Sequence, residues 1–126
     1  MERPLEKISD AELEVMRVLW KAGEALPVSG IRRALCEKNG WESSTVKTLV
    51  QRLHAKGALR QEEREVYYYT PLVTREEYGR YATKRLIDKL YHGSAKSLVA
   101  ALVDSGLSES DVAELRAMLR KEGKNA

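Results

Sequence analysis

Residues 43–70 read SSTVKTLVQRLHAKGALRQEEREVYYYT, and this stretch decides the fold. In its first half, apolar side chains recur at the i, i+3, i+4 and i+7 positions of one buried helical face, namely Val46, Leu49, Val50 and Leu53. In its second half, residues 59–61 and 66–69 alternate and are rich in strand-forming side chains, with a polar loop at 62–65 between them. We therefore predict a mainly α fold with a small β hairpin, in which this helix and hairpin are the recognition helix and wing of a winged helix-turn-helix.

The face of this helix opposite its apolar stripe is polar and lacks acidic residues. It carries short hydroxyls near its start and cations farther along, namely Ser44, Thr45, Lys47, Thr48, Gln51 and Arg52. Because a helix N-terminus attracts phosphate and Lys or Arg side chains reach guanine O6 and N7, this face suits a helix that enters the major groove by its N-terminus. An ordinary solvated helix face is the alternative, and the hairpin that follows favours DNA.

The ends of the helix and the wing are also indicated by the sequence. Ser43 is the predicted N-cap, and Gly57 stands where a left-handed residue is expected to terminate the helix. Along the second strand, alternation buries either Tyr68 or the pair Tyr67 and Tyr69. In both cases at least one phenol remains to contact a sugar-phosphate backbone.

Two helices are predicted upstream of the recognition helix. The first opens with the capping box Ser9-Asp10-Ala11-Glu12 and ends at Gly23. The second, shorter helix follows Pro27 and stops around Asn39-Gly40. Their apolar positions are Leu13, Met16, Leu19 and Trp20 in the first helix and Val28, Ile31 and Leu35 in the second. For Trp20 and Trp41 we expect core packing, since Trp on an apolar stripe is usually well buried.

The remainder of the chain is predicted to be helical. A second capping box, Thr74-Arg75-Glu76-Glu77, opens this part, and Gly93 and Gly106 divide it into three amphipathic helices. We predict a DNA-binding domain at 1–73 and a helical dimerisation domain at 74–126, because two-fold dimers commonly bind pseudo-palindromic half-sites. The alternative is that these helices fold back on the first domain. The predicted dimer contacts are Leu86, Leu90, Leu98, Val99, Leu102, Val103, Leu115 and Leu119.

Composition limits the class of protein. The 126 residues carry a net charge of +3, and residues 43–60 contain four Lys or Arg against no carboxylate, which favours a polyanionic partner. Cys36 is the single cysteine, so no disulfide forms within the chain and one protomer offers no thiol-based zinc site. We find no membrane-spanning run and no signal peptide, and we expect a cytoplasmic protein without membrane insertion.

Catalysis has little support in the sequence. The histidines, His54 and His92, are far apart along the chain, and no nucleophile motif or phosphate-binding glycine loop is present. His54 falls on the polar side of the recognition helix, where it either lies near DNA or faces water, and we expect it to face water. We therefore predict no enzyme activity, no catalytic residues, no metal ligands and no cofactor.

These residues resemble the penicillinase repressor family of bacterial transcriptional regulators (BlaI/MecI/CopY type) over nearly the whole chain. The resemblance runs through Ile8–Met16 with Leu19-Trp20, Trp41–Leu49 with Arg52-Leu53 and Lys56-Gly57, Tyr68-Tyr69, Lys96–Val99 and Leu107-Ser108. It implies a homodimeric repressor that binds double-stranded DNA at inverted TACA/TGTA-like half-sites. It further implies that Ser44, Thr45, Lys47 and Thr48 face the groove and that Arg52, Lys56 and the wing tyrosines contact the DNA backbone. The predicted DNA contacts are therefore Ser43, Ser44, Thr45, Lys47, Thr48, Gln51, Arg52, Lys56, Tyr67 and Tyr68.

The family also suggests how such a repressor is released. In its β-lactam-responsive members, a membrane sensor protease triggers cleavage in the dimerisation region, at a position equivalent to Ala101-Leu102 here. Those members have Asn-Phe at that position, so the substitution argues against cleavage by such a protease. Copper-responsive members end in a cysteine-rich tail, whereas residues 121–126 read KEGKNA, and we expect no copper sensing through that motif.

Two other functions remain as alternatives. A winged helix also serves as a protein-interaction adaptor without specific DNA binding, although the acid-free face of the recognition helix argues against this. A repressor responsive to a small ligand would need a polar-lined pocket, and the sequence shows no convergent set of polar residues for one.

Overall fold

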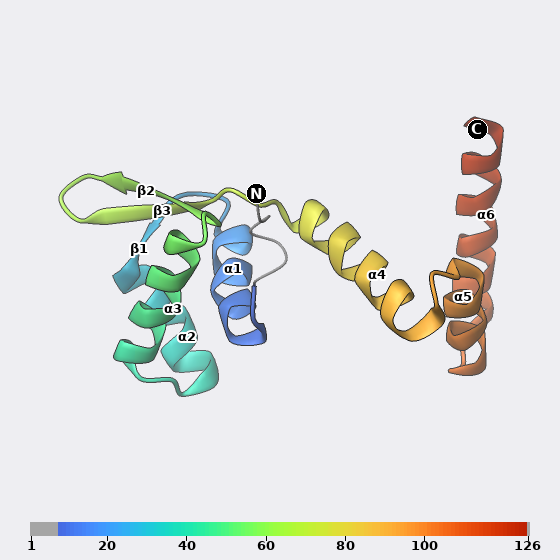
Figure 1. The fold of residues 1–126 in the computed structure, drawn as a ribbon, viewed down its shortest axis with the longest axis horizontal. Helices are drawn as coiled ribbons and strands as arrows, with labels where there is room; N and C mark the ends of the chain where they lie inside the picture. Colours follow the sequence, from blue (N-terminus) through green and yellow to red (C-terminus); the bar gives the residue numbers. More distant parts are fainter. Residues whose placement is uncertain (1–7, 126) are drawn as a thin grey trace. The chain divides into compact units, whose positions relative to one another are not determined.

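The computed structural model describes residues 8–125, with side chains through Lys121, and it divides into two compact units between Tyr81 and Ala82. In the first unit, helices α1, α2 and α3 pack together against a small sheet (Figure 1). The second unit contains the end of α4 and the helices α5 and α6. The predicted fold class, a winged helix-turn-helix followed by a helical region, is confirmed. The predicted domain limit at residue 73 lies just before α4 and stays a prediction.

The three N-terminal helices begin and end close to the predicted residues. α1 spans Asp10–Ala22, and its capping box forms as expected, with the Glu12 N–H donating to Ser9 Oγ at 3.1 Å and the Ser9 N–H donating to Glu12 Oε1 at 2.9 Å. It ends at Gly23, whose φ of 68° is left-handed and therefore favours glycine. α2 spans Val28–Asn39 and α3 spans Ser43–Ala55.

The predicted N-cap of α3 is wrong by one residue. Glu42 is the cap, with an extended φ, ψ of −73° and 153°, and Ser43 is already helical. The reason is that the Glu42 carbonyl accepts the first helical hydrogen bond, from the Val46 N–H at 3.3 Å. The Glu42 side chain makes no capping hydrogen bond.

The sheet has one more strand than the sequence indicated. β2 (Leu59–Glu63) and β3 (Tyr67–Pro71) form the predicted hairpin, and β1 (Leu26–Pro27) pairs with the other edge of β3, giving the order β1-β3-β2. All pairs are antiparallel. The predicted loop at 62–65 is wrong in its first half, since Glu62 and Glu63 continue β2 by pairing with Tyr68 and Tyr67. Val66, predicted to start the second strand, belongs to the turn.

The core lies where the helices meet the sheet. The predicted apolar stripe of α3 is entirely buried, as are apolar side chains from the other two helices and from both hairpin strands. Trp20 and Trp41 are half-buried and pack against this core, and Trp20 Nε1 donates to the Val73 carbonyl at 2.9 Å. The buried apolar residues are Val15, Met16, Leu19, Ile31, Leu35, Val46, Leu49, Val50, Leu53, Ala58, Leu59, Tyr69 and Val73.

Three helices follow, as predicted. α4 spans Arg75–Tyr91, α5 spans Ala95–Asp104 and α6 spans Glu109–Asn125. Hydroxyl side chains of Thr74, Ser94 and Ser108 cap their N-termini. Among the residues described in this part, no side chain of α4 or α5 is fully buried, and none in α6 through Lys121. No helix within residues 8–125 is both long and apolar enough to cross a membrane.

Candidate nucleic-acid interface

The outer face of α3 is exposed along its length. Burial of Val46, Leu49, Val50 and Leu53 against the core turns the opposite side of the helix outward. That outward side carries every polar residue predicted for it, and all of them are exposed: Ser43, Ser44, Thr45, Lys47, Thr48, Gln51 and Arg52. The first turn of α3 contains no acidic residue, so its positive dipole end and its unpaired N–H groups favour an anion.

The hydroxyl group of Thr48, in the first turns of α3, already makes a hydrogen bond within the helix. Thr48 Oγ1 donates to the Ser44 carbonyl at 2.9 Å, a bond that occupies its proton and leaves its oxygen as an acceptor. A base or phosphate contact by Thr48 therefore requires either an incoming donor or rotation of its hydroxyl. Its methyl group remains suited to apolar contact with a thymine methyl.

The wing tyrosines lie on different faces of the hairpin. Tyr69 is buried and Tyr67 is exposed, while Tyr68 is half-buried. Alternation thus places Tyr67 and Tyr69 on the same side of the hairpin, but only Tyr69, which lies farther from the turn, is buried. On the other side, the Arg64 guanidinium lies 4.4 Å from the centre of the Tyr68 ring and its Nε donates to Glu62 Oε1 at 3.2 Å.

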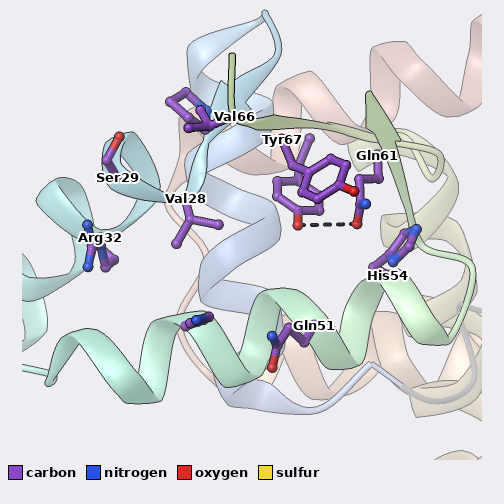
Figure 2. A pocket seen from close by; sticks show the side chains of 11 residues that line it. Val28, Ser29, Arg32, Gln51, His54, Gln61, Val66 and Tyr67 are labelled. Carbon is purple, nitrogen blue, oxygen red and sulfur yellow. Dashed lines mark hydrogen bonds between the residues drawn. The ribbon is translucent and has the colours of Figure 1, made fainter. Parts of the chain in front are cut away.

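A groove of about 660 Å³ separates α3 from the hairpin. Figure 2 shows side chains from three directions around it: Gln51 and His54 from α3, Ser29 and Arg32 from α2, and Gln61 and Tyr67 from the hairpin. The groove is partly open to solvent. Among the described residues that line it none is acidic; they are Pro27, Val28, Ser29, Arg32, Lys47, Gln51, His54, Gln61, Val66, Tyr67 and Tyr69.

Tyr69 and its contacts form part of the groove wall. The Tyr69 hydroxyl donates to Gln61 Oε1 at 3.3 Å, a bond drawn in Figure 2. The His54 ring stands edge-on to the Tyr69 ring, with centroids 6.3 Å apart and an interplanar angle of 72°. Burial, and secondarily Tyr67, raises the pKa of Tyr69, so its phenol keeps its proton at neutral pH and remains a hydrogen-bond donor.

Lys56, a predicted DNA contact, has a partner inside the protein. Its Nζ lies 2.5 Å from Glu12 Oε1 and 2.8 Å from Glu12 Oε2, and Glu12 is only 2% exposed. Burial raises the pKa of Glu12, but hydrogen bonds from Lys56 and Ser9 together outweigh burial, so the pKa lies below its usual value. The pair ties the start of α1 to the end of α3. A phosphate contact by Lys56 stays a prediction and would compete with Glu12.

The structure brings only some of the predicted contacts together. Lys47, Gln51 and Tyr67 line the groove, whereas Tyr68 lies on the opposite side of the hairpin. The sequence prediction missed two residues of α2, Ser29 and Arg32. Their signal was available, because burial of Ile31 and Leu35 leaves positions 29 and 32 on a neighbouring face, one turn apart. Within residues 8–125, no group of three His, Cys, Asp or Glu side chains is placed to hold a metal ion.

Sequence comparison relates this chain to named repressors. The family model described as "Penicillinase repressor" matches residues 8–121. The chain is 32% identical to the penicillinase repressor of Bacillus licheniformis, with 98% of this chain and 96% of that protein covered. It is also 32% identical to the methicillin resistance regulatory protein MecI of Staphylococcus aureus (strain N315), with 97% of this chain and all of that protein covered.

Structural comparison gives the same relation for the N-terminal unit. The solution structure of the DNA-binding domain of the repressor BlaI is 35% identical, with a TM-score of 0.54, 62% of this chain and 94% of that one covered. A second solution structure, Bacillus licheniformis BlaI in its monomeric form in complex with the blaP half-operator, is 38% identical, with a TM-score of 0.50, 57% of this chain and 88% of that one covered.

Proposed function

Because the chain belongs to the penicillinase repressor family, we propose that it is a sequence-specific DNA-binding transcriptional repressor. It binds inverted-repeat operators as a homodimer and represses by occupying them. The proposal assigns no catalytic step and no cofactor to the chain. Because operator binding requires access to the DNA, the proposal includes a cytoplasmic location.

One observation carries this proposal: the acid-free outer face of α3 borders a groove that separates the helix from the wing and whose lining includes Lys47 and Arg32 but no described carboxylate. The major groove of B-DNA is about 12 Å wide, which is enough to admit an α-helix such as α3. The domain that presents it is similar to a BlaI domain solved with its half-operator.

Affinity and specificity come from different side chains of this surface. Exposed Lys and Arg neutralise phosphates and supply the sequence-independent share of the affinity. Ser44, Thr45, Lys47 and Thr48 project from the first half of α3, where side chains reach base edges in the major groove. Arg52, farther along the helix, is assigned to the sugar-phosphate backbone.

The dimeric state is supported by apolar side chains left exposed in the second unit. Leu90, Val103 and Leu119 are more than half exposed, and Leu86, Val99 and Leu102 are each over 40% exposed. Exposed apolar groups of this number in adjoining helices indicate an association surface. Leu98 and Leu115, the other predicted dimer contacts, are half-buried. A two-fold dimer then presents two copies of α3 to the two halves of an inverted repeat.

Release by a membrane sensor protease stays a prediction. Ala101 and Leu102, the position equivalent to the cleavage site of β-lactam-responsive members, lie inside α5. A protease acts on extended backbone, so cleavage there would require α5 to unwind. The Ala-Leu pair in place of Asn-Phe also argues against cleavage by such a protease.

The experiment that tests the function is selection of random double-stranded DNA on the purified full chain, followed by anisotropy titration of the selected duplex and a scrambled control across a range of salt concentrations. We expect an inverted repeat bound about a thousandfold or more tightly than the control. No enrichment, with weak binding that disappears at moderate salt, would contradict the repressor function and favour a protein-interaction adaptor.

A further inference from the structure

The groove between α3 and the hairpin fits one strand of the DNA backbone. A helix in the major groove lies between two phosphate strands, so an element beside the helix must lie over one of them. The hairpin is that element here, and the groove of about 660 Å³ is the space between it and α3. This step rests on the proposed DNA-binding function.

The groove offers donors and cations to a phosphate. Lys47 of α3 and Arg32 of α2 supply permanent positive charge, and Ser29 and Gln61 supply neutral donors. His54 is exposed on α3, two turns beyond Lys47, and borders the same groove (Figure 2). Its ring stands edge-on to the Tyr69 ring of the groove wall, with centroids 6.3 Å apart.

We propose that His54 is a protonation-dependent phosphate contact, so that the operator affinity of this protein rises as the pH falls through the range in which histidine titrates. Neutral imidazole has one donor and one acceptor, whereas imidazolium has two donors and a positive charge. A phosphate offers only acceptors and negative charge. Bound DNA therefore favours the imidazolium, and binding takes up a proton.

The groups that face His54 are consistent with this linkage. Tyr69 of β3 contacts the His54 ring, and the other charged or titratable residues that share the groove with His54 are Lys47 on its own helix, Arg32 on α2 and Tyr67 on β3, while β2 contributes the uncharged Gln61. None of the described residues that line the groove is a carboxylate able to pair with the imidazolium in the absence of DNA. The negative charge that favours protonation thus arrives with the DNA.

The test compares the affinity of the full chain for its selected inverted-repeat duplex at about pH 6 and about pH 8, at constant ionic strength. For the unmodified chain we expect about fivefold tighter binding at the lower pH for each bound protomer, the effect of one exposed ion pair. A dimer that uses both copies of His54 shows up to about 25-fold. His54→Gln should remove this ratio, and His54→Lys should bind tightly at both pH values.

His92 provides the matched control, because it is the only other histidine of the chain. It is exposed after α4, in the second unit, with a φ of 49° that asparagine also tolerates. His92→Asn should keep the pH ratio of the unmodified chain. If His54→Gln keeps that ratio too, the assignment of His54 is wrong although the repressor function stands. If no duplex is bound selectively at either pH, the proposed function itself fails.

Discussion

The two units of this protein use their amphipathic helices in different ways. In the first unit, α1, α2 and α3 bury their apolar stripes against one another and against the sheet, and Met16, Ile31 and Leu53 are fully buried. In the second unit, helices with equally regular stripes and hydroxyl caps leave their apolar side chains exposed. Both units therefore form helices, but among the side chains described through Lys121 a buried core is found in the first unit and not in the second.

This difference suggests a division of labour. A unit that closes its own core can turn one face of a helix to polar side chains, and α3 does so with eight exposed polar residues, His54 included. A unit that leaves apolar surface exposed needs another surface to cover it. We infer that the first unit reads DNA and that the second joins two copies of the chain.

The largest expected effect is loss of stability when the core of the first unit is truncated. Leu53→Ala removes a fully buried side chain on the core-facing side of the recognition helix α3, and it should lower the free energy of unfolding by about 3–4 kcal/mol. Urea unfolding followed by tryptophan fluorescence measures this directly, because Trp20 and Trp41 both belong to the first unit.

The matched control is Leu119→Ala in α6, where the side chain is 68% exposed. At protein concentrations low enough to keep the chain monomeric, this change should alter stability by less than about 0.5 kcal/mol. Equal losses for Leu53→Ala and Leu119→Ala under those conditions would show that the second unit also closes a core within one chain.

Association should respond most to a charge placed in the second unit. Leu102→Asp puts a carboxylate among the exposed apolar side chains of α5, and we expect dimer dissociation at micromolar concentration, equivalent to about 2–4 kcal/mol of association free energy. Sedimentation velocity measures the oligomeric state, and tryptophan fluorescence should show an intact first unit.

A neighbouring exposed position distinguishes a specific contact from a general charge effect. Asp104 ends α5 and is already acidic, so Asp104→Asn changes the charge of the same helix without touching its apolar stripe. This variant should remain dimeric. A Leu102→Asp variant that also stays dimeric would remove Leu102 from the interface.

The ion pair that joins α1 to α3 gives a smaller and pH-dependent effect. Glu12→Gln leaves Lys56 without its carboxylate and weakens the capping box, which should lower stability near neutral pH by about 2 kcal/mol, less than for a fully buried pair because Lys56 remains partly exposed. Since the folded pKa of Glu12 lies below the usual value of 4.5, the pair stabilises the protein above that value. Its contribution is lost as the pH falls through the lowered folded pKa.

The gap in stability between the unmodified chain and Glu12→Gln should therefore narrow in acid, which urea titrations at several pH values measure. Glu24→Gln, at an exposed position just after α1, should show no such gap at any pH. A gap that persists unchanged in acid would assign the loss to packing instead of charge.

The elements that local chemistry determines were predictable from the sequence. Capping boxes at Ser9 and Thr74 and the apolar stripe of α3 each depend on residues within a few positions of one another, and the structure confirms them. The outward face of α3 followed directly, because a helix that buries one stripe must expose the other.

Features that depend on distant partners were not predictable. β1 has two residues, one of them Pro27, and becomes a strand only because Tyr68 and Tyr69 of β3 lie beside it. The pairing of Lys56 with Glu12 joins residues 44 positions apart, so a cation that looked free on the helix has a protein partner. The groove was not predictable for the same reason, because its lining residues come from α2, α3 and the hairpin, which meet only in the folded chain.

The smallest expected effect is a loss of operator affinity that does not change the oligomeric state, and it tests whether DNA binding and association belong to different units. Lys47→Ala removes a cation from the groove and should weaken binding to the selected operator by about 1–3 kcal/mol if Lys47 contacts a base edge, while leaving the dimer intact. Anisotropy titration of operator and scrambled duplexes measures the loss on each. If the affinity for the operator falls more than the affinity for the scrambled duplex, Lys47 contacts a base. If both affinities fall equally, Lys47 contacts a phosphate, and the slope of log affinity against log salt concentration should fall by about one.

Lys84→Ala is the control for the change in net charge, because Lys84 is exposed on the part of α4 that belongs to the second unit. Both variants lower the charge of the chain equally, so long-range attraction to DNA falls by a similar amount in each. Any further loss for Lys47→Ala must come from its position beside α3 and the groove. If the two variants weaken operator binding equally, Lys47 acts on DNA through long-range attraction alone, and its assignment to a contact beside α3 and the groove is wrong.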